Sequence, residues 1–265
     1  MDINDLKNFG KMKPKYKVFK QQPPLFLVSD SEWGETFYHL DRRYYTTPEG
    51  NFYPSVTTFI GYFGDDDWKA GWIERLTKEF GTVEAAEAEA ERISERACNR
   101  GNDIHECLDL YVNNSPKFDP DKAGQFRFML NQIRRVLDRK LDSVYYTEHA
   151  MRSDKLKIAG RCDLAGSWSG FSAIIDYKNK NRMAKREDIA EYFLQGATYA
   201  LMHMEMYGSL PEKIVILVSV EDPNVLECQV FEEWTRDWTP KVIQMARTFQ
   251  SESGYYDGQI QNRKS

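Results

Sequence analysis

The sequence predicts an α/β protein with a central mixed β-sheet flanked by helices, preceded by a β-hairpin and a helical part. The first observation is a pair of long stretches rich in helix-forming residues, at about 83–113 and 119–140. The second is a set of short runs rich in aliphatic and β-branched residues farther along the chain. These runs cover 143–152, 157–168, 171–179, 213–221 and 225–232. The third is a helical pattern at 187–207 between the third and fourth runs, which predicts a crossover within one sheet.

The elements are expected in the following order. Residues 1–24 are polar and form a loosely held arm, and 35–60 form a β-hairpin around the turn "TPEGN". A helix starts at Trp68, and helices over about 83–113 and 119–140 follow. The first three strands are joined by short turns as a meander. Gly208 and Pro211 end the helix at 187–207, and a last helix covers about 235–251. We place a boundary between an arm-and-hairpin part, 1–52, and a main domain, 53–265.

Composition limits the class of protein. The 265 residues are 41% hydrophobic and 14% aromatic, which is enough for a packed core. No apolar run approaches the roughly 20 residues that span a bilayer. The first 20 residues lack the apolar centre of a signal peptide, and their early aspartates are unlike a transit peptide. We therefore expect a cytoplasmic protein with no membrane partner.

Four cysteines, Cys98, Cys107, Cys162 and Cys228, form no CxxC pair and no cluster. Zinc and iron–sulfur sites need such spacing, so we expect no iron–sulfur cluster and buried free thiols instead. The net charge of −5 argues against a nucleic-acid partner, but charge is unevenly distributed. Residues 84–95 carry five glutamates and one arginine, whereas 178–186, "KNKNRMAKR", carry five basic residues and no acid.

Charged residues end the third strand of the meander. "IIDYK" places Asp176 and Lys178 two residues apart, so both leave the same face of the strand. Asp163 lies on the preceding strand, in "GRCD". Two neighbouring carboxylates repel unless a cation neutralises them, and Mg²⁺ suits such oxygen ligands. A lysine beside them would stabilise charge on a phosphate. The alternative is a surface ion pair between Asp176 and Lys178.

An ordered set of motifs extends this site. "RGNDIH" supplies Gly101 and His105, "GRCD" and "IIDYK" follow, and "QGATY" supplies Gln195 and Tyr199 on the next helix. The set resembles the PD-(D/E)XK nuclease superfamily, specifically its RecB-like exonuclease branch. Together with "YPSVTTFI", it is most similar to the mitochondrial genome maintenance exonucleases and their phage relatives, over about 53–250.

The resemblance implies a restriction-endonuclease-like core and a role for each matching residue. Asp163, Asp176 and Lys178, with Gln195 and Tyr199, would be catalytic. The metal ligands would be His105, Asp163, Asp176 and the backbone carbonyl of Tyr177. Glu148, on the first strand, either supports the metal or is a solvated acid. Basic residues that would contact DNA phosphates, or simply lie in a solvated loop, are Arg100, Lys180, Arg182, Lys185 and Arg186.

The function that the resemblance implies is a Mg²⁺- or Mn²⁺-dependent DNA exonuclease using one or two ions. It would digest single-stranded DNA from free ends, in replication, recombination or repair, as a monomer in a bacterial or phage-infected cell. The alternatives are a flap or branch endonuclease on the same fold and an inactive DNA-binding module. Aromatic residues of the hairpin either stack on bases or fill its core, and the core is favoured. They are Tyr44, Tyr45, Phe52 and Tyr53.

Overall fold

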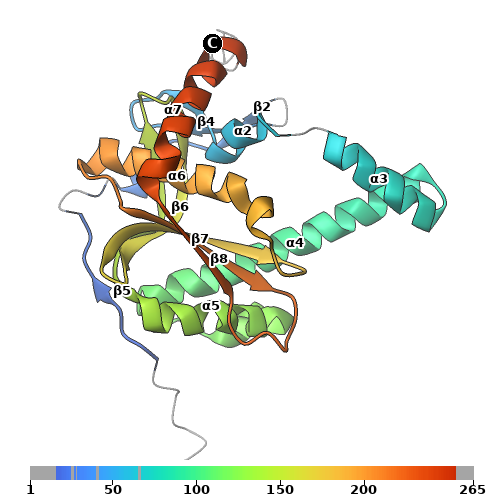
Figure 1. Cartoon of the computed structure of the whole chain (residues 1–265), viewed down its shortest axis with the longest axis horizontal. Coiled ribbons are helices and arrows are strands. Elements are labelled where there is room, and N and C mark those ends of the chain that lie inside the picture. Colours follow the sequence, from blue (N-terminus) through green and yellow to red (C-terminus); the bar gives the residue numbers. More distant parts are fainter. Residues whose placement is uncertain (1–15, 25–26, 28, 40–41, 65–66, 255–265) are drawn as a thin grey trace, which may run out of the picture.

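A mixed six-stranded sheet between two layers of helices forms the body of the protein (Figure 1). The computed structural model describes residues 16–24, 27, 29–39, 42–64 and 67–254. The strand order is β1-β5-β6-β7-β8-β9. Its strands are β1 (Lys20–Gln21), β5 (Leu141–Ser153), β6 (Ile158–Trp168), β7 (Phe171–Lys180), β8 (Lys213–Val220) and β9 (Gln229–Trp234). The predicted α/β class with a mixed central sheet is confirmed.

The predicted meander is β5–β6–β7, paired antiparallel throughout. Ser169 and Gly170 join β6 to β7 with φ of 48° and 86°, the left-handed pair that suits a tight hairpin. β7 then pairs in parallel with β8, so a crossover connects them. That crossover is α6 (Ala190–Tyr207), preceded by a 3₁₀ turn, η3 (Arg186–Ile189), and ended by Gly208 at φ 80°.

Each face of the sheet has its own core. α4 (Val83–Val112) and α5 (Arg127–Lys140) cover one face, and a 3₁₀ segment, η2 (Pro120–Phe126), leads into α5. α6 and α7 (Thr235–Glu252) cover the other face. Side chains alternate along β7, so Ile174 packs with the α6 core and Ile175 with the α4 core. Asp176 and Tyr177, the next two residues, are therefore directed to opposite faces.

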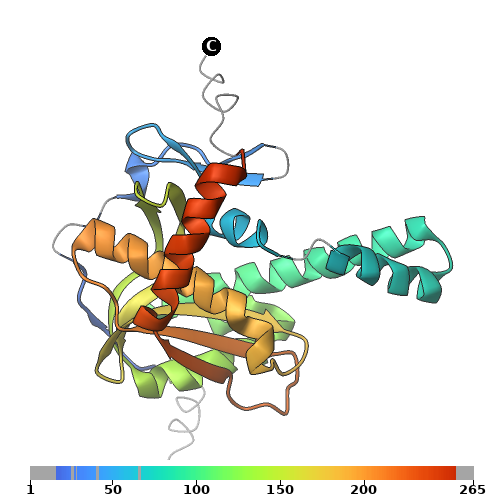
Figure 2. The ribbon, with the colours of Figure 1, turned by 45° about the horizontal axis from the view of Figure 1, so that its top comes forward.

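A helical hairpin projects from this body (Figure 2). It consists of α3 (Asp67–Phe80) and the N-terminal half of α4, which packs against it. Thr82 caps α4, because its hydroxyl accepts a hydrogen bond from Ala85 N–H. Leu76, Ala86 and Ala90 form a small core of their own. The C-terminal half of α4 lies under the main sheet.

The predicted hairpin at 35–60 is wrong in part. The segment forms a three-stranded sheet of β2 (Phe37–His39), β3 (Arg42–Thr46) and β4 (Phe52–Pro54), with a short 3₁₀ turn, η1 (Asp30–Glu32), before it. Residues 56–61 form a helix, α2 (Val56–Gly61), because the Ser55 hydroxyl caps it through Thr58 N–H. Tyr44, Tyr45 and Tyr53 are buried, which confirms the core assignment for these three, and Phe52 is half-buried against the core.

Three other expectations need correction. Residues 16–24 are not a loose arm, since Phe19 is buried and β1 pairs in parallel with β5; residues 1–15 lie outside the described part. Cys98 is exposed, although the other three cysteines are buried as expected. The last strand begins at Gln229 rather than 225. In the described residues, no helix combines the length and apolarity needed to cross a bilayer.

Candidate metal centre

The candidate site lies where β6 and β7 separate. Their pairing ends at Leu164 and Ile175, whereas β7 continues along β8 to Lys180. Asp163, the residue before Leu164 in the chain, lies just beyond this last pair. Its carboxylate accepts a hydrogen bond of 2.9 Å from Tyr177 N–H. A side chain therefore replaces the backbone acceptor that a continuing β6 would have offered. The carboxyl end of β7 is therefore paired with β8 but not with β6.

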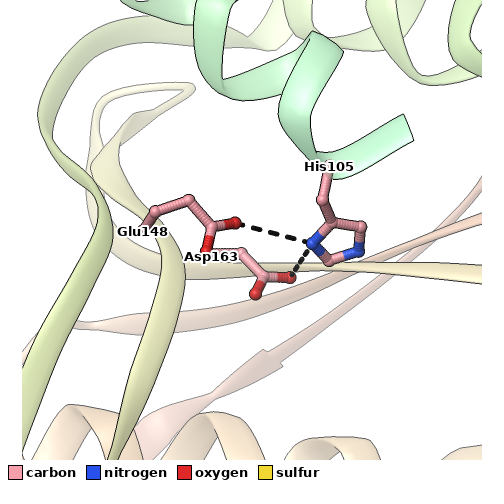
Figure 3. Close-up of side chains that lie close together, drawn as sticks. All are labelled: His105, Glu148 and Asp163. Atoms are coloured by element: carbon pink, nitrogen blue, oxygen red, sulfur yellow. Dashed lines mark ion pairs between the residues drawn. The ribbon is translucent and has the colours of Figure 1, made fainter. Parts of the chain in front are cut away.

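Three possible metal ligands converge where the two strands separate (Figure 3). His105 comes from α4, Glu148 from β5 and Asp163 from β6. His105 Nδ1 lies 3.6 Å from Glu148 Oε1 and 3.6 Å from Asp163 Oδ2. Each residue offers one possible metal-ligand atom, and these three atoms lie within 4.8 Å of one another. His105 and Glu148 are 43 residues apart in sequence and Glu148 and Asp163 are 15 apart, yet all three share one site.

The backbone of Glu148 adopts an unusual conformation. Its φ is 42°, in the left-handed region that few residues other than glycine occupy. Neighbouring pairs, Thr147 with Leu164 and His149 with Cys162, place Glu148 across from Asp163. Such a conformation costs about 1–3 kcal/mol and persists only where surrounding structure enforces it. The strain lies at the residue whose carboxylate is brought to His105, which favours a functional role over a solvated acid.

The His105 ring is held from both nitrogens. Nε2 lies 3.1 Å from the Tyr177 carbonyl oxygen, and the Tyr177 ring meets the imidazole edge-on. Burial alone would lower the His105 pKa, but the carboxylates of Asp163 and Glu148 outweigh it and raise this pKa to about 9. Without a metal, the imidazole is therefore a cation between two anions. A neutral ring that donates Nε2–H to Tyr177 would leave Nδ1 facing both carboxylates, as a metal ligand requires.

Asp176, which is buried, and Lys178, which is half-buried, form an ion pair beside this cluster. The Asp176 side chain is 2% exposed, and Lys178 Nζ lies 2.6 Å from its Oδ2. Burial raises the pKa of Asp176 to about 6, although Lys178 opposes the rise. Burial would lower the pKa of Lys178, but Asp176 and Asp163 outweigh it and raise this pKa. Lys178 is accordingly an ammonium ion at neutral pH.

The donors present suit a hard divalent cation. Carboxylates and carbonyl oxygens are the ligands of Mg²⁺ and Mn²⁺, and one imidazole is common beside them. Ligands on opposite sides of one such ion are about 4 Å apart, so small side-chain rotations would bring the cluster to ligand spacing. Asp176 Oδ1 is buried and has no hydrogen-bond partner among the described residues. Burying a carboxylate oxygen without a partner costs free energy unless a cation or a hydrogen-bond donor binds it.

The structure places the remaining predicted catalytic residues on one face of α6. Tyr199 is buried and packs closely on β6, since a Cβ at Gly160 would lie 2.9 Å from its hydroxyl and 2.9 Å from Val56 Cγ2. Gln195 is half-buried one turn earlier. Tyr192, which the sequence analysis missed, lies on the same face, and Lys178 and Lys180 lie 5.1 and 5.3 Å from its ring centroid. Tyr192 lies three residues before Gln195 and seven before Tyr199, a spacing that predicts a shared helix face.

The predicted DNA contacts fall into two groups. Arg100 is buried and pairs with Glu221 and Asn181, whereas Lys180 is half-buried at the end of β7. The other three residues of the basic tract are exposed: Arg182, Lys185 and Arg186. Lys185 lies 4.0 Å from Glu187, and Arg186 pairs with Glu233. Acids thus balance part of the tract, and Glu221 is a partner that the sequence analysis did not anticipate.

Comparison with known proteins adds little to these observations. No protein-family model matches the chain, and no curated protein matches it. A solved structure described as "Crystal structure of SSO0001" is 15% identical, over 62% of this chain and 80% of that chain, with a TM-score of 0.30. A similarity at this level supports no conclusion about fold family or function.

Proposed function

We propose that this protein is a metal-dependent deoxyribonuclease of the PD-(D/E)XK type, an exonuclease acting on free ends of single-stranded DNA. One observation carries the proposal: His105, Glu148 and Asp163 converge beside the Asp176–Lys178 pair where two strands separate. A metal held by anionic ligands, with an adjacent half-buried ammonium, suits a substrate that is itself an anion. The ordered motifs, and not the geometry, carry the choice of family and of DNA ends.

The residues divide the work by charge. His105, Glu148, Asp163 and Asp176 would hold Mg²⁺ or Mn²⁺, with the Tyr177 carbonyl as a further candidate. A bound ion would act as a Lewis acid and lower the pKa of a coordinated water. Lys178 would act as a fixed cation toward a phosphate oxygen, since the carboxylates of Asp176 and Asp163 raise its pKa in the metal-free protein. Tyr192 and Asp176 hold that ammonium in place.

The first experiment measures cleavage of end-labelled single-stranded DNA with Mg²⁺ or Mn²⁺. We expect Lys178→Ala to slow cleavage about a hundredfold or more. The matched control is Lys213→Ala, because Lys213 is also a strand lysine paired with an acid and its side chain is 16% exposed, against 21% for Lys178. Equal cleavage by wild type and Lys178→Ala would contradict the assigned role of Lys178. Absence of any metal-dependent cleavage would contradict the proposal itself.

Two alternatives have their own measurements. An exonuclease leaves a covalently closed single-stranded circle intact, whereas an endonuclease, for example one specific for flaps or branches, opens a circle carrying its target structure. An inactive DNA-binding module would show no metal binding that depends on the carboxylates. Calorimetric titration with Mn²⁺ separates that reading: the proposal expects Asp163→Asn and Asp176→Asn to abolish or strongly weaken binding.

A further inference from the structure

A second group of charged side chains lies on α4, on the N-terminal side of His105. Arg92, Arg96 and Arg100 recur every four residues, so they lie on successive turns along one side of the helix. Their side chains are 64%, 40% and 3% exposed, respectively. The row therefore runs from solvent into the body, in the direction of the candidate metal centre.

A cavity accompanies this row. It has a volume of about 210 Å³ and is lined by the three arginines with Ile93, Ala97 and Asn181. A water molecule takes about 30 Å³ in the liquid, so the cavity has room for several waters or for a phosphate group. Three of its six lining residues are arginines, and Ile93 and Ala97 contribute apolar surface.

The two inner arginines share one counterion. Glu221, directly after β8, pairs with Arg96 and with Arg100, and Asn181 Oδ1 accepts a further hydrogen bond of 2.8 Å from Arg100. Two positive charges thus face one negative charge. The Nε of Arg100 is buried and has no hydrogen-bond partner within the described residues. The group has more donors than acceptors, which is the property of an anion site.

The cavity lies beside the candidate metal centre, along the same helix, α4. α4 lies along the end of β7, where Tyr177 contacts His105 and Asn181 contacts Arg100. Between these contacts, the Asn179 side chain lies 4.0 Å from the position of a Cβ on Gly101. A helix rises 1.5 Å per residue, which puts Arg100 about 7.5 Å and Arg96 about 13.5 Å from His105 along the axis. A strand with one phosphate at the metal centre would bring a following phosphate to this cavity.

We propose that Arg96, Arg100 and Asn181 form a phosphate-binding subsite for an internal phosphate of the nucleic-acid strand. When no strand is bound, the Glu221 carboxylate pairs with the two guanidinium groups that would bind the phosphate. Guanidinium groups bind carboxylate and phosphate in the same forked geometry, so exchange of one for the other preserves the arrangement. Glu221 is then a competitor that weakens binding. The subsite rests on the proposed function.

The test is fluorescence anisotropy with a labelled twelve-residue oligothymidylate that has hydroxyl groups at both ends. Excess EDTA prevents turnover. We expect Arg96→Gln to weaken binding about tenfold and to lower the slope of log affinity against log salt by about 0.7. Glu221→Gln removes the competitor, so we expect binding to tighten about two- to fivefold. Asn181→Ala provides an independent variant, with weaker binding expected.

The matched controls are Arg139→Gln and Glu227→Gln, which break an exposed arginine–glutamate pair elsewhere. We expect neither control to change affinity by more than about twofold. Unchanged or weaker binding by folded Glu221→Gln, or an unchanged salt slope for Arg96→Gln, would overturn the subsite and leave Glu221 as a tether for β8. Urea denaturation verifies folding. Because binding is measured without metal, a failure of cleavage in the earlier assay is distinguishable from a failure here.

Discussion

Replacing Asp176 by asparagine should stabilise the metal-free protein while it removes metal binding. Asparagine has nearly the shape of protonated aspartate, and burial raises the pKa of Asp176 from 3.8 to about 6. Each pKa unit corresponds to about 1.4 kcal/mol, so ionising this carboxyl in the fold costs about 3 kcal/mol. The value already includes the attraction of Lys178. We therefore expect Asp176→Asn to raise the free energy of unfolding by about 2–3 kcal/mol at pH 8.

The sign of the pH dependence follows from the same shift. Below pH 4, Asp176 is protonated in both the folded and the unfolded chain, so the variant gains nothing. Between pH 4 and 6, the folded wild type binds more protons than the unfolded chain, and its stability falls as pH rises. Above pH 6, the folded carboxyl also ionises and the deficit stays constant. The advantage of Asp176→Asn should appear over this window.

Urea denaturation in EDTA at pH 4, 5, 6 and 8 measures this advantage. Asp237→Asn on α7 is the control, because its carboxylate is 57% exposed and a change of about 0.5 kcal/mol or less is expected. A variant no more stable than wild type at pH 8 would refute the reasoning. An equal advantage at pH 4 and pH 8 would also refute it, because the gain would then not come from ionisation.

Three further predictions concern other parts of the fold. Burial opposes ionisation of Glu232, but Lys140, Lys213 and Trp168 outweigh it and lower its pKa to about 2; urea denaturation should therefore show Glu232→Gln about 1–2 kcal/mol less stable at pH 7 after allowance for solvent screening. That loss should shrink as pH falls from about 4 toward 2, and Glu227→Gln, in an exposed pair, should lose less. Gly160→Ala places a Cβ 2.9 Å from the Tyr199 hydroxyl and should cost about 1–3 kcal/mol in thermal or urea denaturation; wild-type stability would contradict the packing of Tyr199. Glu148→Gln should weaken Mn²⁺ binding about tenfold or more in calorimetry, and unchanged affinity would exclude this carboxylate as a ligand.

The sequence was most informative where local pattern decides structure. Alternating aliphatic residues and the Ser169–Gly170 turn predict the meander, and Asp176 and Lys178 follow from the end of a buried strand. The segment at 56–61 was misassigned because Val and Thr favour strands, whereas the cap from Ser55 stabilises a helix. In this six-residue helix, the stabilisation from the Ser55 cap outweighs the strand preference of Val and Thr.

The site itself depends on long-range contacts that pattern cannot supply. Glu148 remained ambiguous because neither its place across from Asp163 nor its left-handed backbone is visible in the chain. The pairing of Arg100 with Glu221 joins residues 121 apart in sequence, so no local pattern predicts it. Tyr192 was missed because its role depends on which face of α6 meets β7. Sequence gives the residue types of a site, and tertiary packing gives its neighbours.

The continuity of α4 has a mechanical consequence. One uninterrupted helix carries both the projecting hairpin and His105, and the segment from Val83 to His105 is about 33 Å long. α3 braces only the outer part, through contacts such as Leu76 with Ala86. The helix is therefore anchored in the body at its C-terminal half and projects at its N-terminal half, and His105 lies in the anchored half. Because the helix is continuous, a displacement of the projecting hairpin would also displace the turn that positions His105 beside Glu148 and Asp163.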